Sequence, residues 1–261
     1  MRITVFTGNQ PRHLSLIAGF ADIADEVFAI QECSTVFPGK IADFFRDSDV
    51  MQAYFSRVVL AEKEVFGGVR FSPHNVRSLS LKGGDLNSVD RELLAPALQS
   101  DIYVVFGASY IKGSLAEFLV ENKAINIHMG VSPYYRGSSC NFWAIYDGNP
   151  DLVGATIHLL SRGLDSGCIL FHVLPKPGPI DPFILGMQAV SAAHGALIQH
   201  ISAGRLLSLQ PVAQDKRLEI RYSRNRDFTD DVAQEYLARK LGAHEIGEML
   251  KASPRRELIV P

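Results

Sequence analysis

Three polar segments contain side-chain types that together could carry out acyl transfer. Asn126 and His128 lie two positions apart in NIHMGVSPYYRG, so at the end of a strand their side chains would face the same way. Asp165 lies in a second segment, SRGLDSG, and the third segment is TGNQPRH near the N-terminus. An amide donor and an imidazole could hold an oxyanion and move a proton, while a nearby carboxylate would favour the protonated imidazole. These residue types therefore indicate acyl-transfer chemistry.

Each of these residues also has an ordinary structural explanation. Asn126 could bond only to the backbone, His128 could be a buried histidine with satisfied nitrogens, and Asp165 could cap the amides of its own loop. Considered one at a time, these are the simpler explanations. The chemical interpretation depends on elements that bring the segments together.

Alternating apolar runs and amphipathic stretches predict such elements, in an α/β, doubly wound, Rossmann-like fold with a mostly parallel sheet. The three polar segments follow predicted strands, and ligand sites in open parallel sheets lie at the carboxyl ends of the strands. The predicted strands are residues 3–6, 27–30, 103–106, 124–127, 153–160 and 168–174. The predicted helices of the first half are residues 11–21, 41–61 and 88–99, the last with Ser88 as its N-cap.

Residues that begin and end helices in the second half of the chain predict a domain boundary near residue 204. An Asp-Pro pair at residues 181–182 can cap a long helix, and Gly204 can end it. We therefore expect a catalytic domain at residues 1–204 and a small C-terminal extension at residues 205–261. The extension contains a capped helix that starts near Thr229.

Composition limits the class of protein. The 261 residues are 47% hydrophobic, which is ample for a core, and 26 basic against 28 acidic residues create no field that would attract nucleic acid. Cys33, Cys140 and Cys168 show no zinc-site spacing, so we expect buried, reduced thiols and no metal. The first apolar run ends after Phe6, too early for a signal peptide or a membrane span. We expect a cytoplasmic protein with no nucleic-acid or membrane partner.

The motifs resemble those of the folate-dependent formyltransferase family over roughly residues 1–200. In that family an Asn-x-His-Pro-Ser-Leu-Leu-Pro pattern is followed by Tyr-Arg-Gly and later by Leu-Asp-x-Gly. The departures here are Met129, Gly130 and Ser132, which lie in the loop and bear on substrate contacts more than on the reaction. The matching residues are Asn126, His128, Pro133, Tyr135, Arg136, Gly137, Leu164, Asp165 and Gly167.

The resemblance implies a catalytic trio of Asn126, His128 and Asp165 and 10-formyltetrahydrofolate as the formyl donor. An acceptor amine would attack the formyl carbon, Asn126 and protonated His128 would hold the oxyanion, and Asp165 would support the imidazolium. Core packing is the alternative explanation for Tyr110 and Ile111. The residues that the resemblance places beside the pterin are Phe106, Gly107, Ala108, Ser109, Tyr110, Ile111, Arg162, Gly163 and Leu164.

The acceptor differs among three branches of the family that share this domain. The initiator-transfer-RNA branch carries a further barrel domain, for which the residues after the long helix leave little room. The purine branch opens with a Gly-Asn-Gly-Ser-Asn type of phosphate loop, whereas this chain has TGNQPRH, in which Pro11 removes an amide. The segments TGNQPRH, MGVSPYYRGSSCNFWA and SRNRDF instead resemble bacterial sugar N-formyltransferases, most closely those that act on GDP-perosamine.

This branch implies formylation of a nucleotide-linked amino sugar for lipopolysaccharide O-antigen synthesis. The alternative functions are a phosphoribosylglycinamide formyltransferase, a folate-binding module and a formyltetrahydrofolate hydrolase. The sequence does not determine the oligomeric state, for which a homodimer is one candidate. For the two tail arginines, a solvated surface cluster is the alternative to a diphosphate contact. The implied substrate contacts are Asn9, Gln10, Arg12, His13, Tyr134, Tyr135, Arg136, Arg221 and Arg224.

Overall fold

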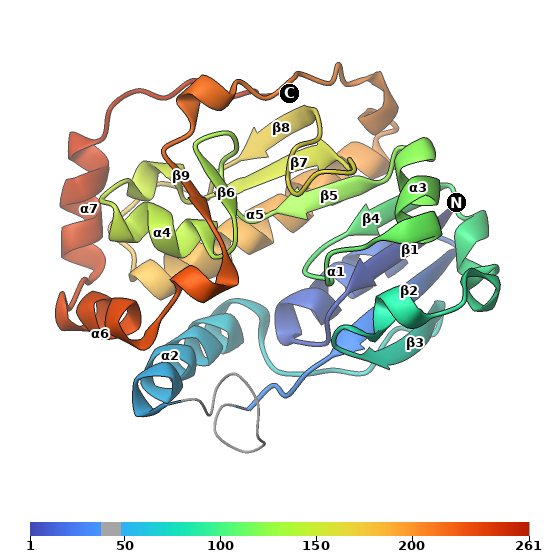
Figure 1. The fold of residues 1–261 in the computed structure, drawn as a ribbon, viewed down its shortest axis with the longest axis horizontal. Coiled ribbons are helices and arrows are strands. Elements are labelled where there is room, and N and C mark those ends of the chain that lie inside the picture. Colours follow the sequence, from blue (N-terminus) through green and yellow to red (C-terminus); the bar gives the residue numbers. More distant parts are fainter. Residues whose placement is uncertain (38–47, 261) are drawn as a thin grey trace.

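The computed structural model describes residues 1–37 and 48–260 and contains a seven-stranded sheet in the order β3-β2-β1-β4-β5-β7-β8 (Figure 1). Strands β1 to β5 run parallel, and β7 and β8 are added antiparallel at one edge. The predicted doubly wound, mostly parallel sheet is confirmed. Its strands are β1 (Arg2–Thr7), β2 (Glu26–Cys33), β3 (Val76–Lys82), β4 (Ile102–Val105), β5 (Ile125–His128), β7 (Ala155–Leu159) and β8 (Ile169–Val173).

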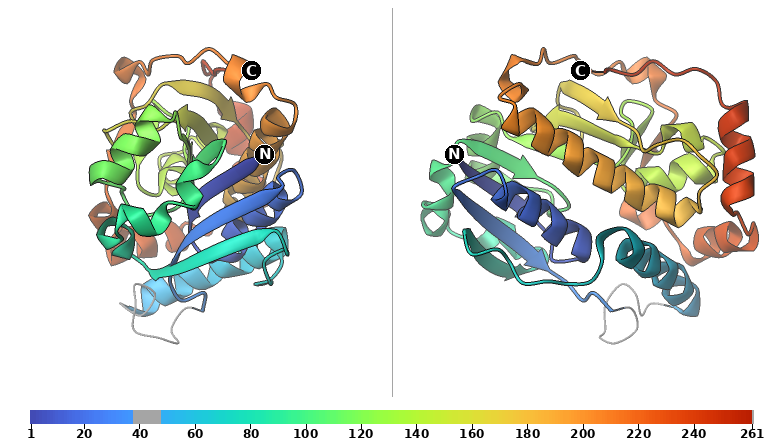
Figure 2. Two further views of the ribbon diagram at one scale, coloured as in Figure 1. Left: turned by 90° about the vertical axis from the view of Figure 1, so that its right-hand side faces the viewer. Right: turned by 180° about the vertical axis from the view of Figure 1, so that it is seen from behind.

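Helices cover both faces of this sheet. Helices α1 (Pro11–Ala21) and α5 (Pro182–Ser202) cross one face, as the view from behind shows, and α3 (Gly113–Glu121) lies on the other (Figure 2). Successive residues of β1 enter the two cores in turn, with Val5 packed toward α1 and α5 and Phe6 toward α3. Burial on both faces explains why Ile3, Val5 and Phe6 do not alternate with exposed polar residues. Among the described residues, none of the helices is long and apolar enough to cross a membrane.

The predicted ends of two helices are confirmed by their caps. The side chain of Asp181 accepts the N–H groups of Phe183 and Ile184 at the start of α5, and Gly204 follows its end with a φ of +64°. Thr229 caps α6 (Asp230–Ala238). These caps satisfy backbone groups that a helix leaves without partners.

The helix predicted over residues 88–99 is wrong. The segment forms separate 3-10 turns at Asp85–Ser88, Arg91–Leu94 and Ala97–Gln99. The backbone is extended at Val89 and Asp90, and the side chain of Asp90 accepts the N–H of Glu92, which starts a new turn in place of a continuing helix.

The second predicted helix, residues 41–61, starts outside the described residues. Its described part is α2 (Asp49–Phe66), which is capped by the hydroxyl of Ser48 and continues past Ala61. All three cysteines are free, as predicted, but only Cys140 is buried; Cys33 is partly buried and Cys168 is exposed.

The residues after 204 share a core with earlier elements. Helices α2, α5, α6, α4 (Cys140–Tyr146) and α7 (Ala243–Ala252) pack around a cluster of aromatic rings. Strand β9 (Arg221–Ser223) pairs in parallel with β6 (Tyr135–Gly137). The division at residues 204 and 205 therefore stays a prediction about sequence organisation. The rings of the cluster belong to Tyr54, Phe142, Phe183, Phe228 and Tyr236.

A buried histidine on α5 should make folding sensitive to acid. Neither ring nitrogen of His194 has a hydrogen-bond partner among the described residues, and the ring packs on Phe106 with centroids 4.9 Å apart. Burial, and secondarily the charge of Arg12, lowers the pKa of His194 to about 3. The folded protein therefore keeps this ring neutral at pH values where the unfolded chain takes up a proton.

We expect the substitution His194→Leu to reduce this acid sensitivity. A histidine with a lowered folded pKa stabilises fully above its ordinary value of 6.5, and this stability is lost as the pH falls from there toward 3. Between about pH 7 and about pH 5, the wild type should lose about 2 kcal/mol more of its unfolding free energy than the variant. Urea unfolding at both pH values measures the difference, and equal losses would contradict the lowered pKa.

Candidate active site

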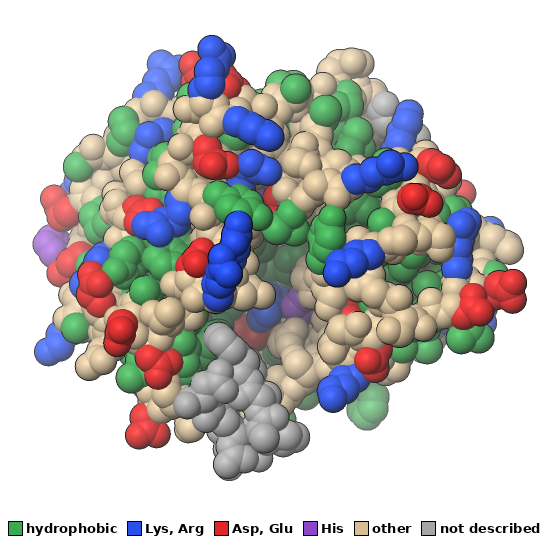
Figure 3. Space-filling model, viewed as in Figure 1, with side chains coloured by type: hydrophobic (Ala, Val, Ile, Leu, Met, Phe, Trp, Pro, Cys, Tyr) green, Lys and Arg blue, Asp and Glu red, His purple; other side chains and the backbone are tan. Residues whose placement is uncertain are grey.

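A cavity of about 810 Å³ lies at the carboxyl ends of β1, β4 and β5. The space-filling view shows this face hollowed near its centre (Figure 3). The sheet order reverses between β1 and β4, and open α/β sheets bind ligands at such a switch point. Asn126, His128 and Asp165 all line the cavity.

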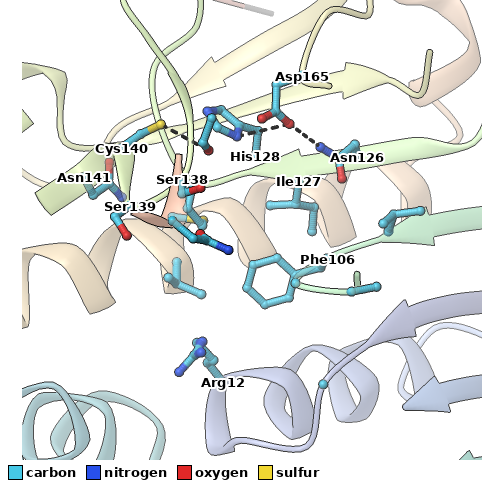
Figure 4. A pocket seen from close by; sticks show the side chains of 18 of the residues that line it. Arg12, Phe106, Asn126, Ile127, His128, Ser138, Ser139, Cys140, Asn141 and Asp165 are labelled. Carbon is cyan, nitrogen blue, oxygen red and sulfur yellow. Dashed lines mark hydrogen bonds and ion pairs between the residues drawn. The ribbon is translucent and has the colours of Figure 1, made fainter. Parts of the chain in front are cut away.

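The three predicted catalytic side chains meet at one carboxylate oxygen. Oδ1 of Asp165 lies 3.4 Å from Nδ1 of His128 and accepts a hydrogen bond of 3.4 Å from the amide of Asn126. Figure 4 shows Asp165 between these two side chains, with Arg12 across the cavity. Only 6% of the His128 side chain and 10% of the Asp165 side chain are exposed. The three residues form a compact, largely desolvated cluster.

The contacts of His128 require a proton on each ring nitrogen. Nδ1 faces the Asp165 carboxylate, and Nε2 lies 3.3 Å from the carbonyl oxygen of Tyr135, so both partners are acceptors. Burial lowers the pKa of His128, but Asp165, followed by Cys140, raises it well above its ordinary value. Burial raises the pKa of Asp165, but the charge of His128 outweighs it and leaves that pKa far below its ordinary value. Both shifts favour an imidazolium paired with a carboxylate.

His158 is a fourth polar member of this cluster that the sequence did not single out. Its Nδ1 lies 2.8 Å from the carbonyl oxygen of Leu159, so Nδ1 carries the hydrogen and Nε2 accepts 2.9 Å from the amide of Asn126. His158 lies directly opposite Asn126 in the pairing of β5 with β7. The sequence signal for His158 was a polar residue within a predicted apolar strand, at residues 153–160. Its pairing with Asn126 could not be predicted, because it depends on the register between the two strands.

The loop after β4 forms one wall of the cavity together with the loop that carries Asp165. The hydroxyl of Tyr110 donates to the carbonyl of Arg162 at 2.6 Å, which joins the two loops. Tyr110 is 48% exposed and Leu164 is 43% exposed, so a ring and an aliphatic side chain are left open at this wall. Ile111 packs in the core beside α3, as the packing alternative stated, and also lines the cavity.

An exposed aromatic and an exposed leucine fit a flat, partly apolar ligand such as a pterin. Arg162 lies outside the described lining of this cavity, with 82% of its side chain exposed. The residues predicted beside the pterin that do line the cavity are Phe106, Gly107, Ala108, Ser109, Tyr110, Ile111, Gly163 and Leu164.

The predicted substrate residues near the N-terminus are divided. Gln10, Arg12 and His13 line the cavity, but His13 is buried, and its Nδ1 lies 3.1 Å from the N–H of Gly8. Arg12 donates to the carboxylate of Glu62 at 2.8 Å. Asn9 lies outside the described lining and bonds through its amide to the backbone of residue 34.

The two predicted tyrosines and Arg136 are occupied within the protein and lie outside the described lining. Tyr134 and Tyr135 are buried, and the Tyr135 hydroxyl lies 3.2 Å from the Asp147 carboxylate. Arg136 pairs with Glu219 at 2.9 Å. Their packing gives these side chains a structural task beneath the site.

The two tail arginines differ from each other. Arg221 bonds both carboxylate oxygens of Asp147, at 2.6 and 2.8 Å, and stacks on the ring of Trp143. Arg224 is exposed and directly precedes Asn225, which lines the cavity. Neither arginine is among the described residues that line it.

The far side of the cavity is formed by residues that the sequence did not indicate. They come from α2, α4, α5 and α6 and from the turn at Asn225–Asp227, which only tertiary packing brings together. Phe142 and Asn225 lie within the quoted segments MGVSPYYRGSSCNFWA and SRNRDF, but no local pattern showed that they line the cavity. The clearest of these lining residues are Tyr54, Phe142, Phe183, Asn225 and Tyr236.

Comparison with known proteins relates the central part of this chain to formyltransferases. The formyl transferase family model matches residues 86–176, which include Asn126, His128 and Asp165. The methionyl-tRNA formyltransferase of Synechococcus sp. (strain JA-3-3Ab) is 33% identical over 132 residues, which cover 48% of this chain and 40% of that protein. The chain thus matches less than half of that relative's length.

Solved structures show the same fold. A sugar N-formyltransferase from Shewanella sp FDAARGOS_354 aligns with a TM-score of 0.51 and 20% identity, over 87% of this chain and 78% of that chain. A second structure is the formyltransferase PseJ from Anoxybacillus kamchatkensis in complex with UDP-4,6-dideoxy-4-formamido-L-AltNAc and tetrahydrofolate. It aligns with a TM-score of 0.52 and 15% identity, over 95% of this chain and 100% of that chain. The chain has the fold of these formyltransferases, and its segment 86–176 matches the formyl transferase family model. The resemblance stated from the motifs is confirmed.

Proposed function

We propose that the protein is a folate-dependent N-formyltransferase. The observation that carries this proposal is the cluster of Asn126, His128 and Asp165, in which a charged imidazole and an amide lie beside an ionised carboxylate on the cavity wall. Donors of this kind stabilise the oxygen of a carbonyl as negative charge develops on it. When bound, 10-formyltetrahydrofolate supplies the formyl group, and no metal is part of the proposal.

Each residue of the cluster has its own role in the proposed reaction. His128 and Asn126 donate hydrogen bonds to the developing oxyanion. His128 exchanges its 3.3 Å contact with the Tyr135 carbonyl for this bond, and Asn126 exchanges its 3.4 Å bond to Asp165 while it keeps the shorter one to His158. Asp165 keeps His128 charged. Because the pKa of Asp165 is far below its ordinary value, the carboxylate is a poor final base. As the bond between the formyl carbon and the folate nitrogen breaks, that nitrogen would take up the proton that the attacking amine releases, and Asp165 and His128 are placed to relay it.

We further propose that the acceptor is the amino group of a nucleotide-linked sugar, GDP-perosamine or a close relative, used for lipopolysaccharide O-antigen. The chain segments that resemble sugar N-formyltransferases support this acceptor, and the cavity has a second side opposite the folate wall. There Arg12 bonds Glu62 through one nitrogen, which leaves guanidinium N–H donors for a phosphate. Arg224 beside Asn225 is the second candidate cation, whereas Arg221 is held by Asp147 and is left out. The cytoplasmic location expected from the sequence is part of this proposal.

A panel of acceptors tests the proposal directly. The protein is incubated with 10-formyltetrahydrofolate and, in separate reactions, GDP-perosamine, UDP-linked and dTDP-linked amino sugars, glycinamide ribonucleotide and methionyl-tRNA. Mass spectrometry detects the addition of one formyl group. We expect GDP-perosamine to be formylated far faster than glycinamide ribonucleotide or methionyl-tRNA.

The other outcomes of this panel separate the alternatives. Formylation of glycinamide ribonucleotide or methionyl-tRNA alone would replace the acceptor and keep the chemistry. Formate release that requires no acceptor would indicate a formyltetrahydrofolate hydrolase. Folate binding without turnover on any acceptor would indicate a binding module and overturn the enzymatic proposal.

A further inference from the structure

The loop that carries Asp165 is held by a glutamine from the C-terminal segment. The amide nitrogen of Gln214 donates to the backbone carbonyls of Asp165 and Gly167, both at 2.8 Å. Two residues earlier, Val212 exchanges two backbone hydrogen bonds of 2.8 Å with Ile169 at the start of β8. The backbone near Gln214 is thus fixed to the sheet edge while its side chain is fixed to the loop.

A second contact holds the same loop through Arg136. One guanidinium nitrogen of Arg136 donates to the carbonyl of Leu164 at 3.2 Å, and another pairs with Glu219 at 2.9 Å. Glu219 lies in the same C-terminal segment as Gln214. Residues 212–219 therefore fix three backbone carbonyls of the loop, two directly and one through Arg136.

The loop needs such contacts because its conformation is not one that Asp165 favours by itself. Asp165 has a φ of +45°, in the left-handed region, which residues other than glycine adopt uncommonly. At Gly167, a Cβ would lie 1.7 Å from the carbonyl oxygen of Leu159, so the chain passes too close for any side chain. Strained backbone of this kind persists only where the surroundings define it.

The orientation of the Gln214 amide is also determined. Its Oε1 is buried and has no hydrogen-bond partner among the described residues, so the side chain gains nothing from that end. The reversed orientation would place Oε1 against two carbonyl oxygens and lose both donated bonds. The NH₂ group must therefore face the loop.

We propose that Gln214 is a positioning residue for the reaction, which holds the Asp165 carboxylate against His128 and Asn126 without touching the substrate. Gln214 lies outside the described lining of the cavity. This inference rests on the proposed function for its kinetic part. With this role for Gln214, the C-terminal segment positions a catalytic carboxylate, whereas the sequence predicted only substrate contacts by Arg221 and Arg224.

The test compares Gln214→Leu with a matched control. Leucine has a similar size but no donor, so the loop is free to shift, and we expect kcat to fall about tenfold or more with little change in the acceptor KM. The imidazole of His128, followed by NMR, should titrate at lower pH as Asp165 moves away. Besides Asp165, the titratable groups that face this ring are Cys140 and His158, and neither is changed. Gln210→Leu makes the same substitution at an exposed position of the segment and should change neither quantity.

The outcomes are separable. A folded Gln214→Leu protein with unchanged kcat and unchanged His128 titration would overturn the inference, and so would a lower Tm alone. If the leucine variant does not fold, Gln214→Ala removes the same amide without placing an apolar branch against the carbonyls. If the wild type formylates no acceptor, the proposed function fails, while the His128 titration still decides whether Gln214 positions Asp165.

Discussion

Replacing His128 with alanine is expected to lower kcat by about 100-fold or more, as the loss of an oxyanion donor does in other enzymes. Its imidazolium is the one cationic group of the cluster, and Asp165 holds it charged. Asn126→Ala should lower kcat by a similar factor, because Asn126 supplies the neighbouring amide donor. Steady-state kinetics with the acceptor identified by the panel measure both variants.

A matched control separates chemistry from packing in this experiment. His200 of α5 is also a buried histidine, but it packs on Phe171 of the edge strand β8. It lies outside the described lining of the cavity. His200→Ala should therefore reduce stability and leave kcat nearly unchanged. A rate near that of the wild type in folded His128→Ala protein would remove His128 from the catalytic assignment.

The sequence predicted the central trio because the needed information was local. Asn126 and His128 share a face through their two-residue spacing, and the ends of parallel strands meet at one edge of the sheet. Asp165 was added by the match of its short motif to the family pattern. No long-range contact had to be known to select these residues.

The rest of the site depends on contacts that no local pattern contains. His158 faces Asn126 only through the register of an antiparallel strand pair, and Gln214 reaches Asp165 across many residues of chain. Arg221 was predicted as a diphosphate contact from its charge, but the structure places the Asp147 carboxylate against it. Charge patterns show which groups are available and not which partners occupy them.

Asp165→Asn is expected to lower kcat and to change its dependence on pH. In the wild type, the carboxylate raises the pKa of His128 well above its ordinary value of 6.5, against the effect of burial. Asparagine is nearly the same size but uncharged, so burial then dominates and the pKa of His128 falls. At neutral pH the ring loses its proton, and the cluster loses its cationic donor.

The direction of the pH change follows from which form of His128 is active. If the protonated ring holds the oxyanion, kcat falls as the pH rises through the pKa of His128, and in the variant this fall should begin at lower pH. Stability should change in the same sense: a raised histidine pKa stabilises fully below 6.5, and this stability is lost as the pH rises through the folded pKa. The variant should lack that loss.

Asp151→Asn is the matched control, since the Asp151 carboxylate is also largely buried and paired. It is bonded to Arg256 at 3.0 Å and lies outside the described lining of the cavity. Its pH profile should remain that of the wild type. Profiles of kcat recorded across the neutral and alkaline range, together with Tm values, decide between two roles for Asp165. A lower kcat whose fall begins at the same pH as in the wild type would mean that Asp165 shapes its loop but does not keep His128 charged. A fall that begins at lower pH only in Asp165→Asn assigns the charge of His128 to this carboxylate, because no other acidic side chain among the described residues is paired with that ring.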